Sequence, residues 1–284
     1  MSWVERGSKS RRPHEVKPGE AQGPQTPDGL AVLGRSVLRL AAAFRAMMSV
    51  FGRTLYFVAR GVPQPGAVAR QMYEIGNRSL VFLCVVMGFI GMIFVYQTGL
   101  QIKRVVPDLT LLGATYLELL VRDLAASICA LMLATRVGAG IAAEIGSMVV
   151  TEQVDALRMC AADPIDYLIK PRFVASVIMT TMLVVVAAAG AFGAGMYTGQ
   201  FFFDINPRTF INVSLIDVGD VSVGLSKCLA YGAVIPVISG YCGLTTYGGS
   251  EGVGQATTRA VVNSSLAVIM LNFAISGLGF LVFG

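Results

Sequence analysis

The sequence predicts an all-α polytopic membrane protein with an N-terminal interfacial amphipathic helix, five transmembrane helices and a cytoplasmic helix between two of the spans. Of the 284 residues, 55% are hydrophobic and 14% are charged, and the mean hydropathy is +0.68. This composition is too apolar for a soluble domain. Five apolar runs are each long enough to cross about 30 Å of hydrocarbon. We expect helices, because a helix satisfies its own backbone hydrogen bonds in lipid.

The N-terminal region precedes the first apolar run and has two parts. Residues 1–28 are polar and contain several prolines and glycines, which predicts a disordered cytoplasmic tail. Residues 29–62 are predicted to form the interfacial amphipathic helix, with arginines on one stripe and Leu, Phe and Val opposite. A soluble helix packed on a partner protein is the alternative. The stripe consists of Arg35, Arg39, Arg53 and Arg60.

The remaining chain, residues 63–284, is predicted to hold the five spans. The second run carries three charged side chains and the fourth carries Lys227, whereas the other three runs are uncharged. Charges at membrane depth usually pair with one another or line a cavity. The spans are expected at about 79–102, 111–135, 173–197, 221–241 and 260–284.

The distribution of basic residues predicts the orientation. If the N-terminus is cytoplasmic, the segments on that side hold 17 Lys and Arg residues, against 3 on the outer side. Cytoplasmic segments are generally enriched in Lys and Arg, so we expect a cytoplasmic N-terminus and an outer C-terminus. Residues 1–78 carry a net charge of +7, which indicates contact with anionic lipid headgroups rather than with nucleic acid.

A charged, helix-forming segment from Glu144 to Leu157 separates the second and third runs. Apolar residues recur in it at roughly helical spacing, and Pro164 and Pro171 follow it. We expect a helix at the membrane surface. It is either a simple connector or a docking helix for a cytoplasmic partner, and the candidate docking residues are Glu144, Met148, Glu152, Asp155 and Leu157.

Two blocks of sequence resemble the MlaE/YrbE permease family. The first is Glu144-Ile-Gly-Ser-Met with Thr151-Glu-Gln-Val-Asp-Ala-Leu157, followed by Asp163-Pro164 and Pro171-Arg172. The second, Gly252 to Val262, is similar to the family's final loop and the start of its last helix. The resemblance extends from about residue 65 to the C-terminus. Family members are membrane subunits of ABC transporters that work with MCE proteins and move lipids.

The resemblance implies a permease subunit in the bacterial cytoplasmic (inner) membrane. It would move phospholipid or a related lipid between that membrane and an MCE-domain protein on its outer face. The segment 144–157 would be the coupling helix that contacts an ABC ATPase subunit. A second permease copy or a paralogue would complete a dimer, and the partner ATPase would bind ATP-Mg and supply the energy.

The sequence itself contains no pattern for an ATPase site or another catalytic site. The glycine-rich loop at Gly248–Gly254 lacks the Gly-Lys-Ser/Thr of a phosphate-binding loop. His14 is the single histidine, and the five cysteines have no metal-ligand spacing. We therefore expect a transport subunit that is not an enzyme and has no cofactor or metal of its own.

The candidate substrate-binding residues are the charges inside the spans: Glu118, Arg122, Asp123 and Lys227. Glu118 and Arg122 are four residues apart and share a helix face, so they can form a structural ion pair. Alternatively, Arg122 contacts an anionic lipid headgroup while Glu118 or Asp123 holds it, and the resemblance favours this role for Arg122. Lys227 either extends to the outer interface or offers a second cationic contact.

Two other functions are alternatives to the lipid permease. One is a proton-driven secondary transporter of an amphipathic substrate, with Glu118 and Asp123 carrying protons. The chain shows no internal repeat of the kind that many secondary transporters have. The other is a structural membrane scaffold, which the charges inside the second span disfavour.

Overall fold

The computed structural model describes residues 29–61, 65–105, 111–212 and 214–283. The predicted disordered tail, residues 1–28, lies outside this described part. The chain divides into two units, Met1–Phe44 and Arg45–Gly284. In the first unit, the described residues form the beginning of helix α1, which spans Gly29–Arg60 without interruption. Its position at a membrane interface stays a prediction.

Five helical segments of the second unit are long and apolar enough to cross a membrane, as predicted. The first is α2 (Pro65–Val105), the fourth α9 (Val218–Leu244) and the fifth α10 (Gly249–Phe283). The third joins the π-helical turn η3 (Ile165–Ile169) to α7 (Lys170–Phe203). Most of these helices extend beyond the predicted runs at one or both ends, because helical backbone continues into polar flanking residues that a hydropathy pattern does not detect.

The second span is interrupted twice by π-helical turns but continues to residue 150. It consists, in order, of α3 (Leu112–Leu119), η1 (Leu120–Leu124), α4 (Ala125–Leu133), η2 (Ala134–Gly138) and α5 (Ala139–Val150). A π-helical turn widens the helix locally and changes the direction in which the following side chains point; such turns are frequent at functional sites. Both turns contain arginines of this span, Arg122 in η1 and Arg136 in η2.

The predicted loop helix 144–157 is not one element. Glu144 and Met148 lie in α5, at the end of the second span, and a separate short helix, α6, covers Gln153–Met159. Glu152 between them has a left-handed backbone, with φ 59°. A non-glycine residue in this conformation cannot continue a right-handed helix, so the chain turns here.

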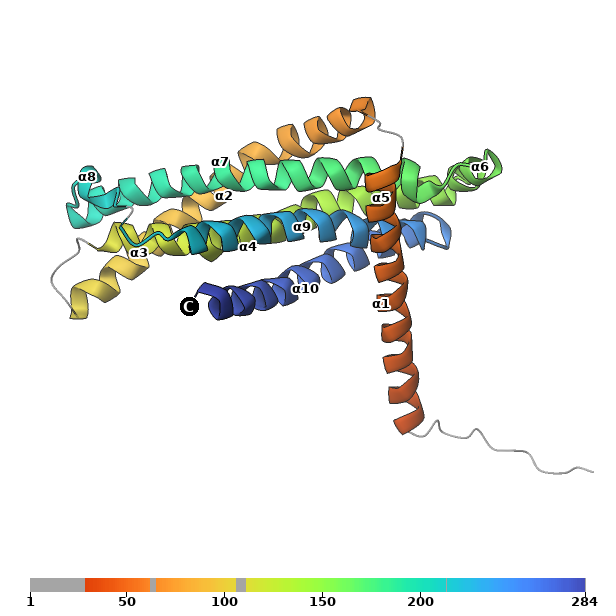
Figure 1. Cartoon of the computed structure of the whole chain (residues 1–284), viewed down its shortest axis with the longest axis horizontal. Helices are drawn as coiled ribbons and strands as arrows, with labels where there is room; N and C mark the ends of the chain where they lie inside the picture. Colours follow the sequence, from red (N-terminus) through yellow and green to blue (C-terminus); the bar gives the residue numbers. More distant parts are fainter. Residues whose placement is uncertain (1–28, 62–64, 106–110, 213, 284) are drawn as a thin grey trace, which may run out of the picture. The chain divides into compact units, whose positions relative to one another are not determined.

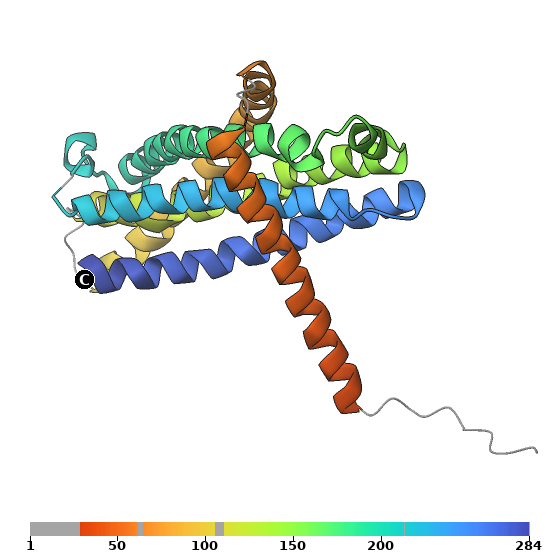
Figure 2. The same ribbon diagram turned by 45° about the vertical axis from the view of Figure 1, so that its right-hand side comes forward.

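The helices of the second unit pack side by side (Figure 1). The first span, α2, lies along α7, and α7 also contacts α9. The last helix, α10, runs beside α9; both are blue in Figure 2. It also contacts α5. In the most apolar 18-residue stretch of α9, 56% of the residues are buried, whereas in that of α10 only 11% are buried. The last span therefore leaves most of its apolar surface open to lipid or to another subunit.

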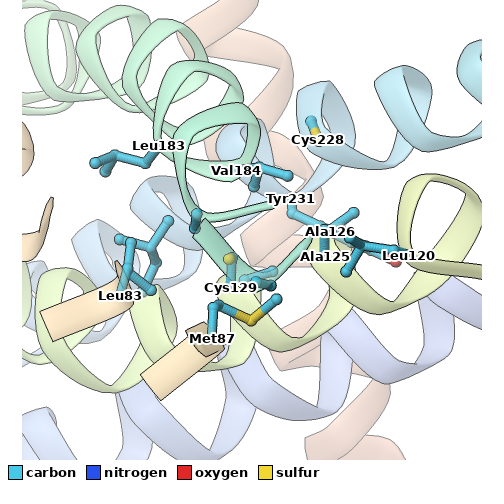
Figure 3. Close-up of a cluster of buried hydrophobic side chains, with 14 of the residues drawn as sticks. Leu83, Met87, Leu120, Ala125, Ala126, Cys129, Leu183, Val184, Cys228 and Tyr231 are labelled. Atoms are coloured by element: carbon cyan, nitrogen blue, oxygen red, sulfur yellow. The ribbon is translucent and has the colours of Figure 1, made fainter. Parts of the chain in front are cut away.

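The largest cluster of buried apolar side chains joins the second span to its neighbours (Figure 3). Leu83 and Met87 of α2 and Leu183 of α7 lie around Cys129 of α4, and Tyr231 of α9 belongs to the same cluster. The cluster also contains small residues of α4, Ala125 and Ala126, which allow close helix packing in lipid. The cluster therefore holds the second span against the first, third and fourth.

Within the second unit, the apolar side of α1 packs partly on the helix bundle. The ring centroids of Phe51 and Phe173 are 6.3 Å apart, and Val50 and Phe57 contact a buried cluster around Ile145. Other apolar residues of α1, including Met48 and Leu55, are exposed. The amphipathic pattern therefore serves protein packing for part of the helix.

Candidate functional site

Four charged side chains of the second and fourth spans form two ion pairs. Arg122 Nη1 donates to Asp220 Oδ1 at 3.2 Å, and Lys227 Nζ donates to Asp123 Oδ1 at 2.5 Å. The sequence predicted that Glu118 or Asp123 holds Arg122. This prediction is wrong, because Arg122 pairs with Asp220. The pairs connect two spans rather than neighbouring turns of one helix.

The local backbone explains why these pairs form. Arg122 and Asp123 are consecutive residues of η1, whereas Asp220 and Lys227 are seven residues apart on α9, about two helical turns, and so share a face. Gly224 lies between these two residues. A Cβ atom added at Gly224 would collide with the backbone oxygen of Val121. The absence of a side chain at Gly224 thus allows the fourth span to approach η1 closely enough for both pairs.

Lys227 is fully buried, so its predicted extension to the outer interface is wrong. Asp123 Oδ1 accepts its ammonium group and also the hydroxyl of Ser127, at 3.1 Å. Nearby, the Tyr231 hydroxyl donates to Asn272 Oδ1 of α10 at 3.2 Å. A buried ammonium group is tolerable only when an anion compensates it. The Lys227 ammonium group therefore lies in the packed interior, while the Asp123 side chain that compensates it is 38% exposed.

Arg122 is in a different environment, because its side chain is 40% exposed while that of Asp220 is 10% exposed. Asp220 also accepts the backbone N–H of Asp217 through Oδ2, at 3.1 Å, and Asp217 accepts the N–H of Val218. Asp217 and Asp220 thus form a capping box at the start of α9. Arg122 is held on one side by a fixed carboxylate and keeps the rest of its guanidinium accessible.

Asp220 was not among the predicted site residues, because the fourth span was expected to begin at residue 221. A signal was present: Asp217 and Asp220 are three residues apart at the start of an apolar run, the spacing of a capping box. This signal moves the beginning of the fourth span from residue 221 to Val218, as observed. Glu118 lies on α3 and has no ion pair or hydrogen bond from its side chain within the described ranges.

The predicted docking residues separate into two groups. Glu144 of α5 pairs with Arg172 of α7, with 2.7 Å between Oε1 and Nη2. Arg172 is buried and also donates from Nη1 to the backbone oxygen of Leu168 at 2.8 Å. This contact ties the end of the second span to the start of the third. Glu144 is therefore a link between spans rather than part of the short helix.

The second group surrounds α6. Glu152 and Asp155 are exposed, and Asp155 pairs with Arg158 at 2.9 Å on the same helix. Next to them is a groove of about 330 Å³, and Met159 on the same helix is 90% exposed. The groove is lined by Met148, Gln153, Ala156, Leu157, Cys160, Tyr167 and Leu168. Met148 and Leu157 thus come together, beside exposed carboxylates.

The part of the chain that the structure describes has five segments that can span a membrane, and charged contacts join two of them. A short exposed helix lies between the second and third segments. These features define a multi-pass membrane protein of the permease class. A family model described as Permease MlaE matches residues 68–278. The chain belongs to this family of ABC transporter permeases. Membership in this family implies a transport subunit with an ATPase partner, which disfavours the proton-driven alternative.

Relatives that cover most of the chain carry the same description. A probable ABC transporter permease protein of Synechocystis sp. is 37% identical over 244 residues, 85% of this chain and 91% of that protein. A probable ABC transporter permease protein of Rickettsia felis is 35% identical over 240 residues, 84% of this chain and 89% of that protein. The chloroplastic protein TRIGALACTOSYLDIACYLGLYCEROL 1 of Arabidopsis thaliana is 32% identical over 237 residues, 81% of this chain and 66% of that protein.

Proposed function

We propose that this permease moves phospholipid or a related lipid between the inner membrane and an MCE-domain protein on its outer face, with energy from ATP-Mg hydrolysed by the ATPase partner. The family description supports the ATPase-driven transport. The name of the Arabidopsis relative contains that of a galactolipid, which supports a lipid as the substrate. The observation that carries the proposal is the half-exposed Arg122 beside the fixed carboxylate of Asp220.

Arg122 is the proposed contact for the lipid headgroup. A guanidinium group has several N–H donors, and Asp220 engages Nη1, so other donors are available for a phosphate. Lys227 has no exposed surface and its charge is balanced by Asp123, so its proposed role is to position η1 rather than to touch lipid. Glu118 on the same span would line the approach to Arg122.

The exposed helix α6 is the proposed docking element for the ATPase. Its apolar groove would receive a side chain of the partner, while Glu152 and Asp155 would meet basic groups around it. Closure of the ATPase pair would reach the spans through the Glu144–Arg172 contact between α5 and α7. In Figure 1, α6 lies at one end of the bundle, and α3 and α8 (Pro207–Phe210) lie at the other.

This arrangement agrees with a cytoplasmic N-terminus and an outer C-terminus. The α6 end would face the cytoplasm, and the end that holds α8 and the start of α9 would face the MCE protein. One chain has few helices with which to enclose a lipid, and the last span leaves most of its apolar surface open. A second permease copy or a paralogue would therefore cover that surface of α10.

The proposal is tested by extracting the complex in mild detergent and identifying co-purifying proteins and phospholipids by mass spectrometry. We expect an ATPase, an MCE-domain protein and bound phospholipid. Replacing Arg122 with Gln should remove most of the bound phospholipid, whereas Arg104→Gln, at the end of α2, should leave it unchanged. Equal phospholipid content in both variants would remove the support for Arg122 as the headgroup contact.

A further inference from the structure

A second polar site lies at the other end of the second span. A cavity of about 640 Å³ lies between α2 and the segment formed by η2 and α5. Its polar lining comes from both sides: Gln71, Glu74, Arg78 and Ser79 from α2, and Arg136 and Glu144 from the second span. Arg136 is fourteen residues beyond Arg122, which corresponds to about 20 Å along a helix axis. The cavity is therefore separate from the site around Arg122.

The charges of this cavity do not cancel. Glu74 pairs with Arg70 at 3.3 Å, and Glu144 pairs with Arg172 at 2.7 Å, and neither of these two arginines lines the cavity. The two arginines that do line it, Arg78 and Arg136, form no ion pair within the described residues. Both carboxylates are thus engaged by arginines outside the cavity, and Arg78 and Arg136 are the lining cations left without an ion pair in the described residues.

The hydroxyl of Ser79 adds an unused hydrogen-bonding group. Ser79 is 1% exposed, and its Oγ has no hydrogen-bond partner. By contrast, Ser222 and Ser226 in α9 each donate to a backbone oxygen one turn earlier. Buried polar groups without a partner are rare in proteins, so the Ser79 hydroxyl points to a missing acceptor.

A neighbouring cavity of about 580 Å³ shares Gln71 and Glu144 with the first. It is lined by Arg172, whose Nε is the other buried side-chain atom without a hydrogen-bond partner in the described part of the chain. Both such atoms therefore belong to residues around the same pair of cavities. This is the pattern expected where a polar ligand completes the hydrogen bonding.

The place of the arginines along the chain indicates the depth of the site. Arg78 directly precedes the apolar run of α2, and Arg136 directly follows the apolar run of the second span. Both therefore lie at the same membrane surface, which is the cytoplasmic one in the proposed orientation. The guanidinium of Arg136 also lies 5.7 Å from the ring centroid of the exposed Phe82, a contact that holds it at this depth.

We propose that the cavity between α2 and α5 binds a phosphate-bearing ligand, with Arg78 and Arg136 as its cationic contacts and the Ser79 hydroxyl as a further donor. Guanidinium groups recognise phosphate through paired, charge-assisted hydrogen bonds. A phospholipid headgroup of the adjacent leaflet and free phosphate share this chemistry. Binding here does not depend on transport through the Arg122 site, so either proposal can fail alone.

The first arm of the test uses lipid. The full chain is reconstituted in phosphatidylcholine vesicles that contain phosphatidylglycerol with a photoreactive group on its headgroup, and adducts are mapped by mass spectrometry. We expect adducts in the segments 71–79 and 136–144. In the double variant Arg78→Gln, Arg136→Gln these adducts should fall about tenfold or more, because two charge-assisted contacts are lost. Adducts near Arg122 report on the other site and should persist.

The second arm uses inorganic phosphate. The thermal stability of the detergent-purified protein is compared in phosphate and in chloride at equal ionic strength. A gain in phosphate that the double variant lacks, with lipid adducts unchanged, would assign the site to free phosphate. If neither the adducts nor the phosphate response differs between the double variant and the wild type, the proposal is overturned.

Two further variants serve as controls. Arg104→Gln removes the same charge from the opposite end of α2 and should leave both readouts unchanged. Gly140 lines the cavity, and a Cβ atom added to it would have no atom from outside its own stretch of helix within 4 Å. The variant Gly140→Leu therefore places a side chain in the cavity while it retains both arginines. It also improves the helix propensity at this position. We expect this variant to fold and to lose the adducts. Wild-type adducts in Gly140→Leu would also overturn the proposal, even if the double arginine variant did not fold.

Discussion

Lys227 Nζ lies 2.5 Å from Asp123 Oδ1, and the lysine side chain has no exposed surface. This contact joins the second span to the fourth across 104 residues of sequence. Next to it, Arg122 pairs with Asp220, and here the cation is the exposed member, at 40%. The difference in burial between the two cations assigns them different roles, although both were candidate substrate-binding residues.

Replacing Lys227 with Met should destabilise the protein by about 1–3 kcal/mol, because Asp123 would keep a charge without its partner, although its 38% exposed side chain remains partly accessible. The double variant Lys227→Met, Asp123→Asn should recover most of this loss. Thermal unfolding in detergent measures both. Wild-type stability of the single variant would contradict the structural role of the pair between Lys227 and Asp123.

Arg122→Gln should reduce the stability of the protein by about 1–2 kcal/mol, because Arg122 is partly exposed but Asp220, 10% exposed, would keep only its capping hydrogen bonds. The same variant should lose most of its bound phospholipid and its lipid transfer. Arg122→Lys keeps the charge but not the planar donor group, and we expect an intermediate loss. Phospholipid per permease chain and thermal stability are measured together, so that a folding defect is recognised.

Gly224→Ala should separate η1 from α9 and weaken both ion pairs, because the new Cβ would meet the backbone oxygen of Val121. Forcing extra volume into a packed contact costs about 1–3 kcal/mol. Gly193→Ala is the matched control, since Gly193 lies in α7 with no atom near its added Cβ. Equal melting temperatures for the two variants would contradict the close approach at Gly224.

Charge reversal on α6 should weaken the association with the ATPase. Glu152→Lys and Asp155→Lys each place a cation where we expect basic groups of the partner, at a cost of up to a few kcal/mol. Co-purification of the ATPase and lipid transfer are the measurements. The control is Lys103→Glu, at the opposite end of the bundle, which should leave both unchanged. Full ATPase recovery with the α6 variants would assign docking to another surface.

Two deletions test the predicted roles of the N-terminal region. Removing residues 1–28 should leave membrane insertion and transport nearly intact, because this stretch has no apolar face. Removing residues 30–60 should prevent assembly, because it also deletes the packing of Phe51 on Phe173. Membrane fractionation and lipid transfer distinguish the two. Failure of the shorter deletion to assemble would contradict the prediction of a dispensable tail.

The sequence by itself determined the all-α class, the five spans and the family. Each of these depends on local information: an apolar run of sufficient length must cross lipid as a helix, and the blocks around Glu144–Leu157 and Gly252–Val262 are contiguous in sequence. The charges within the second span were also evident, because a charged residue in an apolar run needs no structure to be recognised. Their candidate status as functional residues followed from the same fact.

Only the tertiary structure decided which charges meet. Helical spacing offered Glu118 to Arg122, but the π-helical turn η1 and the side-chain-free surface at Gly224 direct Arg122 to Asp220 and Asp123 to Lys227 instead. Neither feature has a local sequence rule, since each depends on packing against a helix about 100 residues away. The left-handed backbone at Glu152, which separates α5 from α6, was likewise not indicated by helical periodicity.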